Sequence, residues 1–238
     1  MTVGDWDVAE ARLRALERQH DLSPEATTAL HDLLQVFATD EHAATTVRDP
    51  DVAVDRHVAD GLSGLTVDAV SSAERIVDIG TGAGVPALVL AIARPACTVV
   101  ALDTVGRKVG WVVGVAERLG LSNLVGVHAR AEDWPDGLGR HDVVTARAVA
   151  PLGVLIEYAG PLLRVGGSLV AWKGALDAEE RAAAEVARAA LAMGAIDERP
   201  VVPWDGARDH RLMVVPKPGP TPKGFPRRVG LARRRPLG

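Results

Sequence analysis

The sequence predicts an α/β fold with a mostly parallel seven-stranded sheet, an antiparallel last strand and a set of N-terminal helices. Short β-branched runs alternate with Ala-rich stretches through the middle of the chain, as in parallel strands joined by helical crossovers. A turn with three glycines on alternate positions follows the first of these runs. Such sheets bind ligands at the carboxyl ends of their strands, so we expect the functional site there.

The first 65 residues are expected to form a helical extension. Residues 7–20 carry apolar side chains at helical spacing between charged ones. Ser23 can cap a second helix, with Pro24 at its first position and Glu25 in its first turn. A third helical segment begins at residue 50 and is expected to stop near Gly61, where the helical pattern ends.

The central domain, residues 66–216, is expected to hold the sheet. We predict strands at 75–79, 97–103, 124–130, 141–147 and 167–173, and helices at 86–93, 105–119, 151–163 and 177–193. Two further runs, 196–203 and 209–216, are separated by a short loop. A parallel connection needs a dozen or more residues, so these two runs are expected to pair as an antiparallel hairpin.

Charge is distributed unevenly along the chain. Residues 217–238, the tail, hold seven cations and no acid, so the net charge of −4 combines +7 in the tail with −11 in residues 1–216. A terminus rich in Pro, Gly and Arg is often solvated and disordered. The alternative is an arm that docks on the phosphates of a nucleic acid.

The amino-acid composition argues against several classes of protein. The single Cys97 excludes a disulfide framework and a multi-cysteine metal site, and we expect no metal. No apolar run reaches the roughly 18 residues of a membrane span, and no charged segment precedes an apolar stretch near Met1. We therefore expect a cytoplasmic protein without a membrane partner. No coiled-coil heptad is present, so a monomer is the default expectation.

The turn "DIGTGAGVPA" (78–87) predicts a cofactor site. Its glycines, Gly80, Gly82 and Gly84, permit positive φ angles and a close approach of the backbone to a ligand. The pattern alone does not separate NAD from S-adenosylmethionine. Asp78 favours S-adenosylmethionine, because a carboxylate here would repel a pyrophosphate and attract the cationic aminoacyl-sulfonium end of that cofactor.

Acidic residues follow the next two strands as well. Asp103 closes the second strand, where its carboxylate can accept hydrogen bonds from both ribose hydroxyls. Ala131, Glu132 and Asp133 follow the third strand and are expected near the adenine. The alternative is that Asp103 and Glu132 are helix caps or surface charges.

Arg147, with no acid beside it, follows the fourth strand in "TARAVAPL" (145–152). Enzymes that methylate exocyclic amines carry an Asp/Asn-Pro-Pro-aromatic loop at this point, and ribose methyltransferases carry an Asp with flanking lysines. Methylation of a pyrimidine carbon needs a cysteine nucleophile, whereas Cys97 is expected to be a buried apolar residue. The acceptor that fits is one already nucleophilic, such as the lone pair of guanine N7, for which positioning and electrostatics suffice.

Several segments in one order resemble a known family. They are "VRDPDVAVDRHVADGL" (47–62), "VDIGTGAGVPALVLAI" (77–92), "LDTVGRKVGWV" (102–112), "TARAVAPL" (145–152), "AWKG" (171–174) and "TPKGFPRRVGLARRRPL" (221–237). The chain is similar to the bacterial small-subunit ribosomal RNA guanine-N7 methyltransferases, the glucose-inhibited division protein B family. The resemblance implies a Rossmann-like class I methyltransferase that methylates guanine N7 in the decoding-region loop of 16S ribosomal RNA with S-adenosylmethionine.

The resemblance also implies roles for particular residues. The family's cofactor positions correspond to Gly80, Val85, Ala131, Glu132 and Arg147. Residues expected to face the RNA or the target base are Arg56, His57, Arg147, Lys173 and the tail cations Lys223, Arg227 and Arg228, with Arg107 and Lys108 as further cations of the RNA surface. Of these, Arg147 and Lys173 are the candidate catalytic residues. The chain departs from the family pattern at Ala38–Thr39 and Ala43–Thr45, and Phe225 replaces the usual Tyr.

Alternatives remain for several residues and for the whole protein. His57 can be read as a surface histidine, Lys173 as a cation at a helix start, and Trp111 and Trp172 as core residues. A small-molecule methyltransferase would share the cofactor site, and a non-catalytic RNA-binding module would share the basic tail. If the tail is an RNA arm, deletion of residues 218–238 is expected to weaken RNA binding and leave cofactor affinity nearly intact.

Overall fold

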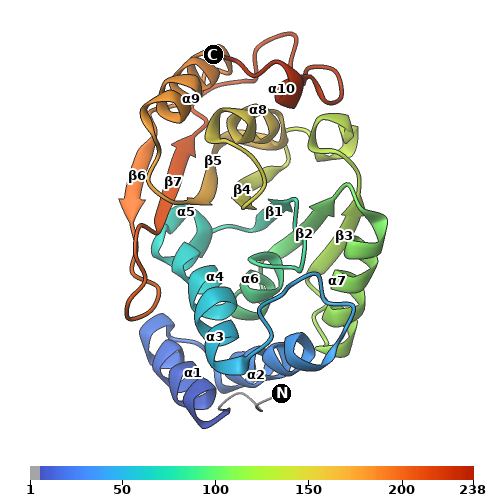
Figure 1. Cartoon of the computed structure of the whole chain (residues 1–238). Helices are drawn as coiled ribbons and strands as arrows, with labels where there is room; N and C mark the ends of the chain where they lie inside the picture. Colours follow the sequence, from blue (N-terminus) through green and yellow to red (C-terminus); the bar gives the residue numbers. More distant parts are fainter. Residues whose placement is uncertain (1–5) are drawn as a thin grey trace.

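The structure is a computed structural model that describes residues 6–238, in which helices cover both faces of a seven-stranded sheet (Figure 1). The strands lie in the order β3-β2-β1-β4-β5-β7-β6. Their bounds are Arg75–Ile79 (β1), Thr98–Asp103 (β2), Leu124–His128 (β3), His141–Arg147 (β4), Leu163–Lys173 (β5), Asp197–Pro200 (β6) and Arg211–Pro216 (β7). Strands β1 to β5 run parallel, and β7 pairs antiparallel with β5 and β6. The predicted sheet and its antiparallel hairpin are confirmed.

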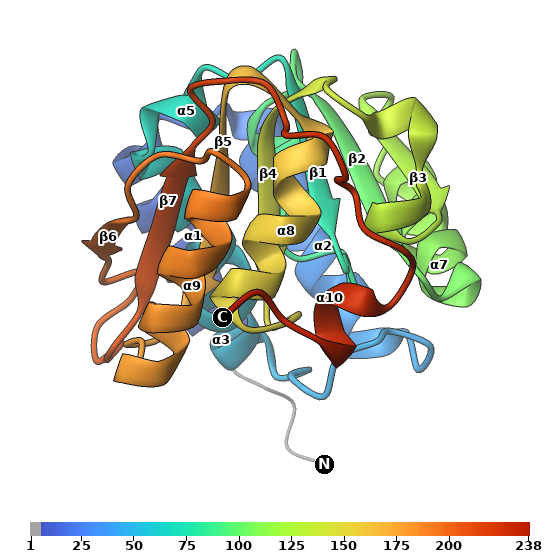
Figure 2. The same cartoon turned by 90° about the horizontal axis from the view of Figure 1, so that it is seen from above.

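The helices that join the strands lie where the sequence predicted them. They are α6 (Ala87–Ala93), α7 (Gly106–Arg118), α8 (Leu152–Leu162) and α9 (Ala178–Ala190). A short helix, α5 (Asp68–Ser71), precedes β1. Helices α8 and α9 pack on one face of the sheet (Figure 2), and α6 and α7 pack on the other with the N-terminal helices.

The N-terminal helices begin as predicted. Helix α1 spans Trp6–His20 and α2 spans Pro24–Thr39. The amide of Ala26 donates to the hydroxyl of Ser23 at 3.2 Å, which is the expected cap of α2. These helices share one apolar core with the sheet, because Leu34 and Phe37 pack in the same cluster as Ile76 and Leu88. The boundary predicted after residue 65 therefore falls within a shared core.

The third N-terminal segment is longer than predicted. It runs from α3 (Pro50–Ala53) through a π-helical turn (Val54–Ala59) into α4 (Asp60–Ser63) and a 3-10 turn (Gly64–Thr66). The expectation that it stops near Gly61 is wrong. A Cβ at Gly61 would lie 3.0 Å from Val89 of α6, so this glycine permits a close approach of two helices rather than ending one.

The tail is packed on the domain rather than solvated. It crosses the face formed by α8 and α9 (Figure 2) and contains the short helix α10 (Leu231–Arg234). Lys217 is 3% exposed, and its Nζ donates to the carbonyl of Gly160 at 2.6 Å. Ala232 is buried in the apolar cluster around α8, and Phe225 packs against that cluster. Among residues 6–238, no helix has both the length and the apolar composition needed to cross a membrane.

Candidate active site

The glycine turn begins where β1 ends. Gly80, Gly82 and Gly84 have φ angles of 68°, 57° and 78°, all in the left-handed region. A Cβ at Gly80 would lie 2.7 Å from a methyl carbon of Val149, in the loop after β4. Val85 is buried directly behind the turn. The absence of a side chain at Gly80 thus permits the close approach of the turn to the loop after β4.

Asp78 lies beneath this turn and is 1% exposed. The hydroxyl of Thr145 on β4 donates to its Oδ1 at 2.9 Å, whereas Oδ2 has no hydrogen-bond partner among the described residues. Burial raises the pKa of Asp78 to about 6. A buried carboxylate oxygen without a partner fits a ligand that supplies a cationic or N–H group.

Asp103 joins the glycine turn to the end of β2. The amide of Gly82 donates to its Oδ2 at 3.0 Å, and the amide of Val105 donates to its Oδ1 at 2.9 Å. The residue is 6% exposed and is therefore not a surface charge, and it is not the cap of α7, because Val105 holds the N-cap position. Each oxygen keeps further acceptor capacity. Its contact with ribose hydroxyls stays a prediction.

A cavity of about 270 Å³ opens at this end of the sheet. Four of the predicted cofactor residues line it: Gly80, Asp103, Ala131 and Glu132. Lys108, which the sequence suggested for RNA, also lies on its wall, as do Tyr158 of α8 and Arg233 of the tail. Asp78, Gly82, Gly84 and Val85 are not among its lining residues and shape the turn from behind. The residues present fit a ligand with a cationic end and hydroxyl groups, as S-adenosylmethionine has.

A second pocket, of about 470 Å³, adjoins the first at Ala148, which lines both. Ala148 has a φ of 56°, a left-handed conformation that alanine rarely adopts. Walls of the second pocket come from Arg147, Trp172 and Lys173 at the ends of β4 and β5 and from the loop that precedes β7. Ligands in the two pockets would therefore meet at the turn after β4.

Arg147 faces the second pocket and is held by the third N-terminal segment. Its Nη1 donates to the carbonyl of Arg56 at 2.8 Å and to Oδ2 of Asp60 at 2.7 Å. Asp60 is 5% exposed, and its Oδ1 lies 3.5 Å from Nδ1 of His210. Charge-assisted hydrogen bonds between such weakly solvated groups fix the direction of the guanidinium. Arg147 therefore lies on the acceptor side, while its contact with the cofactor stays a prediction.

Lys173 lines the second pocket and also has a partner at a helix start. Its Nζ lies 2.6 Å from Oε1 of Glu180, in the first turn of α9. Trp172 is 6% exposed and donates its indole N–H to the carbonyl of Asp60 at 2.8 Å. Trp111 packs against the first apolar cluster. Both tryptophans thus pack in or against the core, as the alternative interpretation predicted, and Trp172 also lines the second pocket.

His57 is not at the surface, where its predicted role in RNA binding would place it. The residue is 4% exposed, its ring packs 4.9 Å from that of Phe37, and its Nε2 lies 3.0 Å from the Thr45 hydroxyl. Burial, helped by the positive charge of Arg147, lowers the pKa of His57 to about 4. A neutral buried imidazole does not contact phosphate, so the structure corrects both this expectation and the alternative of a surface histidine.

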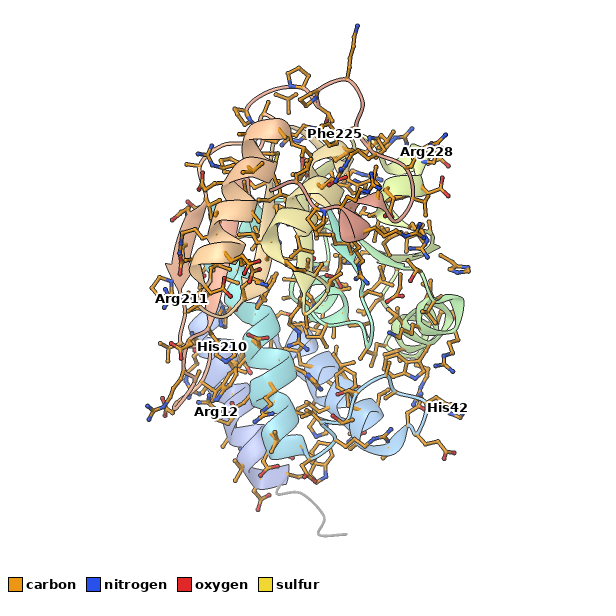
Figure 3. All side chains as sticks on the ribbon, turned by 45° about the horizontal axis from the view of Figure 1, so that its top comes forward. Arg12, His42, His210, Arg211, Phe225 and Arg228 are labelled. Carbon is orange, nitrogen blue, oxygen red and sulfur yellow. The ribbon has the colours of Figure 1, made fainter. Side chains whose placement is uncertain are left out.

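Arg227 points into the domain rather than toward RNA. Its Nε donates to Oε1 of Glu157 at 2.6 Å, and Glu157 is 4% exposed on α8. The predicted phosphate contact of this residue is therefore replaced by an internal ion pair. Arg56, Arg107, Lys223 and Arg228 are exposed, and Figure 3 labels Arg228 at the edge of the molecule formed by the tail. Their contact with RNA stays a prediction.

Sequence reasoning missed His210, Tyr158 and Arg233. His210 and Arg211 lie together at the hairpin (Figure 3), and Arg211 pairs in register with Lys173. An antiparallel strand begins where its parallel neighbour ends, so the predicted hairpin already implied that the start of β7 lies at the site. Tyr158 sits in a wholly buried helix and Arg233 in a segment interpreted as an RNA arm. Neither residue stood in a sequence motif that would have predicted its place in the cavity.

Cys97 is fully buried, as predicted. Burial raises the pKa of its thiol, which disfavours the reactive thiolate. The residue lies directly before β2, at the end of the sheet away from both pockets. It therefore has no position from which to act as a nucleophile there.

Known proteins resemble this chain in sequence and in fold. The family model described as rRNA small subunit methyltransferase G matches residues 25–198. A protein named ribosomal RNA small subunit methyltransferase G from Chloroflexus aggregans is 40% identical over 205 residues, 85% of either chain. One of the same name from Symbiobacterium thermophilum is 38% identical over 81% of this chain and 82% of its own. The S-adenosylmethionine-dependent methyltransferase SibL, 16% identical, has the same fold, with a TM-score of 0.56 over 90% of this chain and 75% of its own.

Proposed function

This chain belongs to the rRNA small subunit methyltransferase G family, and from that membership we propose that it methylates N7 of a guanine in the decoding-region loop of 16S ribosomal RNA. It is a methyltransferase of this family with the Rossmann-like class I fold, and S-adenosylmethionine is its methyl donor. We further propose that it works as a monomer in the cytoplasm, on the small ribosomal subunit or its RNA.

The observation that carries the proposal is the pair of pockets that meet at Ala148. When bound, S-adenosylmethionine supplies an electrophilic methyl group. On this proposal the glycine turn lies along the methionine portion, with Asp78 below it as the counter-charge. Asp103 accepts from the ribose, and Ala131 and Glu132 bound the adenine. The methyl group then faces the second pocket.

The second pocket supports an acceptor that needs no general base. Its side chains at the end of β4 and β5 are the cations Arg147 and Lys173, and each already has an anionic partner, Asp60 and Glu180. Guanine N7 carries a lone pair and no proton, so its methylation requires orientation rather than deprotonation. Arg147 can donate a hydrogen bond to O6 of guanine, next to N7, which orients the base and leaves the N7 lone pair free to attack the methyl group. We propose this positioning role for Arg147, with Lys173 beside it.

Methyl transfer from labelled S-adenosylmethionine tests the proposal directly. The substrates are free 16S RNA and small subunits that lack the modification, with 23S RNA as the control. The label is expected in 7-methylguanosine after digestion to nucleosides, and at one nucleotide of the 16S chain. Label in another nucleoside would contradict the N7 assignment.

The two alternative functions predict different results in the methyl-transfer assay and in calorimetry with S-adenosylmethionine. A small-molecule methyltransferase would bind S-adenosylmethionine and leave ribosomal RNA unlabelled. A non-catalytic RNA-binding module would bind the RNA and show no cofactor heat in calorimetry. Either result would exclude the proposed reaction.

A further inference from the structure

The tail reaches the predicted cofactor cavity at two points. The amide of Gly230 donates to Oε1 of Glu132 at 2.9 Å. Arg233 lines the cavity, and its Nη2 donates to the carbonyl of Val149 at 2.9 Å. These bonds tie the tail to the loops that follow β3 and β4. The loop after β3 lies where the adenine is expected, and the loop after β4 lies where the cavity adjoins the second pocket.

One guanidinium holds this part of the tail against α8. Arg227 makes two hydrogen bonds to the carboxylate of Glu157, which is 4% exposed. Its Nη2 also donates to the carbonyl of Arg235 at 3.0 Å. Arg227 therefore closes residues 227–235 into a loop around α10 and fixes that loop to the domain. Gly230 and Arg233 lie within this loop.

Further contacts anchor the tail before, within and after the loop. The Nζ of Lys217 donates to the carbonyl of Gly160 and, at 2.7 Å, to the hydroxyl of Thr221. Ala232, 3% exposed, packs in the apolar cluster around α8, and Leu237 packs against it. A segment held by buried polar and apolar contacts along its length is part of the folded domain. It is not an appendage.

The charges of the tail therefore divide into two groups. Lys217 and Arg227 are directed inward to partners in the domain. Lys223, Arg228, Arg233, Arg234 and Arg235 are exposed, and of these five only Arg233 lines the cofactor cavity. Arg227 and Arg228 are adjacent in sequence and differ in this respect, which provides a matched pair for experiment.

We propose that the tail is a structural part of the S-adenosylmethionine site, where it closes the side of the cavity formed by the loops after β3 and β4. Arg233 is its cofactor-binding residue, and Arg227 is a positioning residue that acts through Glu157. The inference rests on the proposed cofactor and replaces the expectation that removal of the tail leaves cofactor affinity intact. Cofactor binding and docking of the tail stabilise each other, because thermodynamic coupling between two events is reciprocal.

Calorimetry with S-adenosylhomocysteine on the full chain is the first test. Arg227→Met is expected to raise the dissociation constant at least about fivefold, the lower end of usual coupling between sites. The matched control Arg228→Met is expected to stay within about twofold of wild type in cofactor affinity. Arg227→Lys keeps the positive charge but not the paired N–H donors of the guanidinium. Its dissociation constant is expected to lie between those of the two Met variants. Wild-type affinity in a folded Arg227→Met protein would overturn the proposal.

Limited trypsin digestion of the wild-type protein tests the same coupling without a variant, and so covers the case in which Arg227→Met does not fold. Cleavage after Arg228, Arg233 and Arg234 is expected to slow at least about fivefold when S-adenosylhomocysteine is saturating. Cleavage after exposed Arg14, far from the cavity, is the internal control and is expected to change little. Equal protection of both regions, or none, would overturn the proposal.

The outcomes separate this inference from the proposed function. If wild-type protein binds S-adenosylhomocysteine while Arg227→Met binds equally well, the cofactor assignment stands and the role of the tail fails. If wild-type protein shows no binding, the cofactor assignment itself fails. Weaker binding by Arg227→Met together with ligand protection of the tail supports both.

Discussion

Arg147 at the end of β4 and Asp60 on α4 form an ion pair in which Nη1 and Oδ2 are 2.7 Å apart, although 87 positions separate the residues in sequence. The pair brings the N-terminal helices into the site. The carboxylate is nearly buried, and its second oxygen lies 3.5 Å from His210 on the opposite wall of the pocket. Asp60 thus joins three separate parts of the chain around the predicted acceptor.

Loss of this ion pair is expected to impair the reaction with RNA and to leave cofactor binding nearly unchanged. Asp60→Asn removes a charge-assisted hydrogen bond worth about 1.5–3 kcal/mol, so kcat/KM for RNA should fall about 10- to 100-fold. Affinity for S-adenosylmethionine should stay within about threefold, because Asp60 does not line the cofactor cavity. Asp55→Asn is the control, since Asp55 lies in the same helical segment and pairs with Arg12. Equal losses in the two variants would contradict the prediction.

Replacement of Asp103 is expected to weaken both the cofactor site and the fold. Asp103→Ala leaves the amides of Gly82 and Val105 without their acceptors, which costs about 1–3 kcal/mol for each buried group. The glycine turn would lose its tie to β2, and S-adenosylmethionine should bind at least about tenfold more weakly. Calorimetry and thermal unfolding measure the two effects. Exposed Asp136, which does not line the cofactor cavity, is replaced by Ala as the control. Unchanged cofactor affinity in a folded Asp103→Ala protein would remove Asp103 from the site.

Cofactor affinity is expected to depend on the ionisation of Asp78. Its pKa of about 6 lies above the value of about 4 in an unfolded chain. The stability that Asp78 contributes is therefore fully present below about pH 4 and is lost as the pH rises through about 6. Cofactor binding should change in the opposite direction, because only the charged form attracts the cationic end of the ligand.

Calorimetric titration of S-adenosylmethionine between pH 5 and 8 measures this dependence. In wild-type protein the affinity should fall as the pH drops below about 6. Asp78→Asn should bind more weakly at pH 8 and show little change with pH. A wild-type affinity that is flat across this range would exclude Asp78 as the counter-charge.

The exposed cations of the tail are expected to contact RNA phosphates. Replacing Lys223, Arg228, Arg234 and Arg235 by Gln keeps the internal anchors Lys217 and Arg227 in place. Each lost phosphate contact should flatten the slope of log K against log[salt] by roughly 0.7–0.9. Cofactor affinity should be unchanged, in contrast to the Arg227 variant. The same RNA affinity and salt slope as wild type would leave Arg56, Arg107, Arg147 and Lys173 as the candidate RNA surface.

Much of the fold could be predicted from the sequence because its signals are local. The β-branched runs, the cap at Ser23 and the short spacing of the last two strands depend on neighbours in the chain. The glycine turn with Asp78 and Asp103 also indicated the cofactor end of the sheet, since parallel strands must end on one edge. Strand ends and turn chemistry therefore predicted which residues line the cavity proposed for the cofactor.

The other half depended on which distant segments pack together, and the sequence alone determined no such contact. Nothing local distinguishes Arg227, which binds buried Glu157, from exposed Arg228 beside it. Likewise, the sequence predicts a helix end at Gly61, whereas this glycine permits close packing on Val89. The sequence also suggests an exposed side chain at His57, whereas the ring is buried against Phe37. The sequence determined the strands, the turn and the charges available to the site. Only the tertiary structure decided which charges are neutralised internally, because burial and pairing are set by surfaces that lie far apart in the chain.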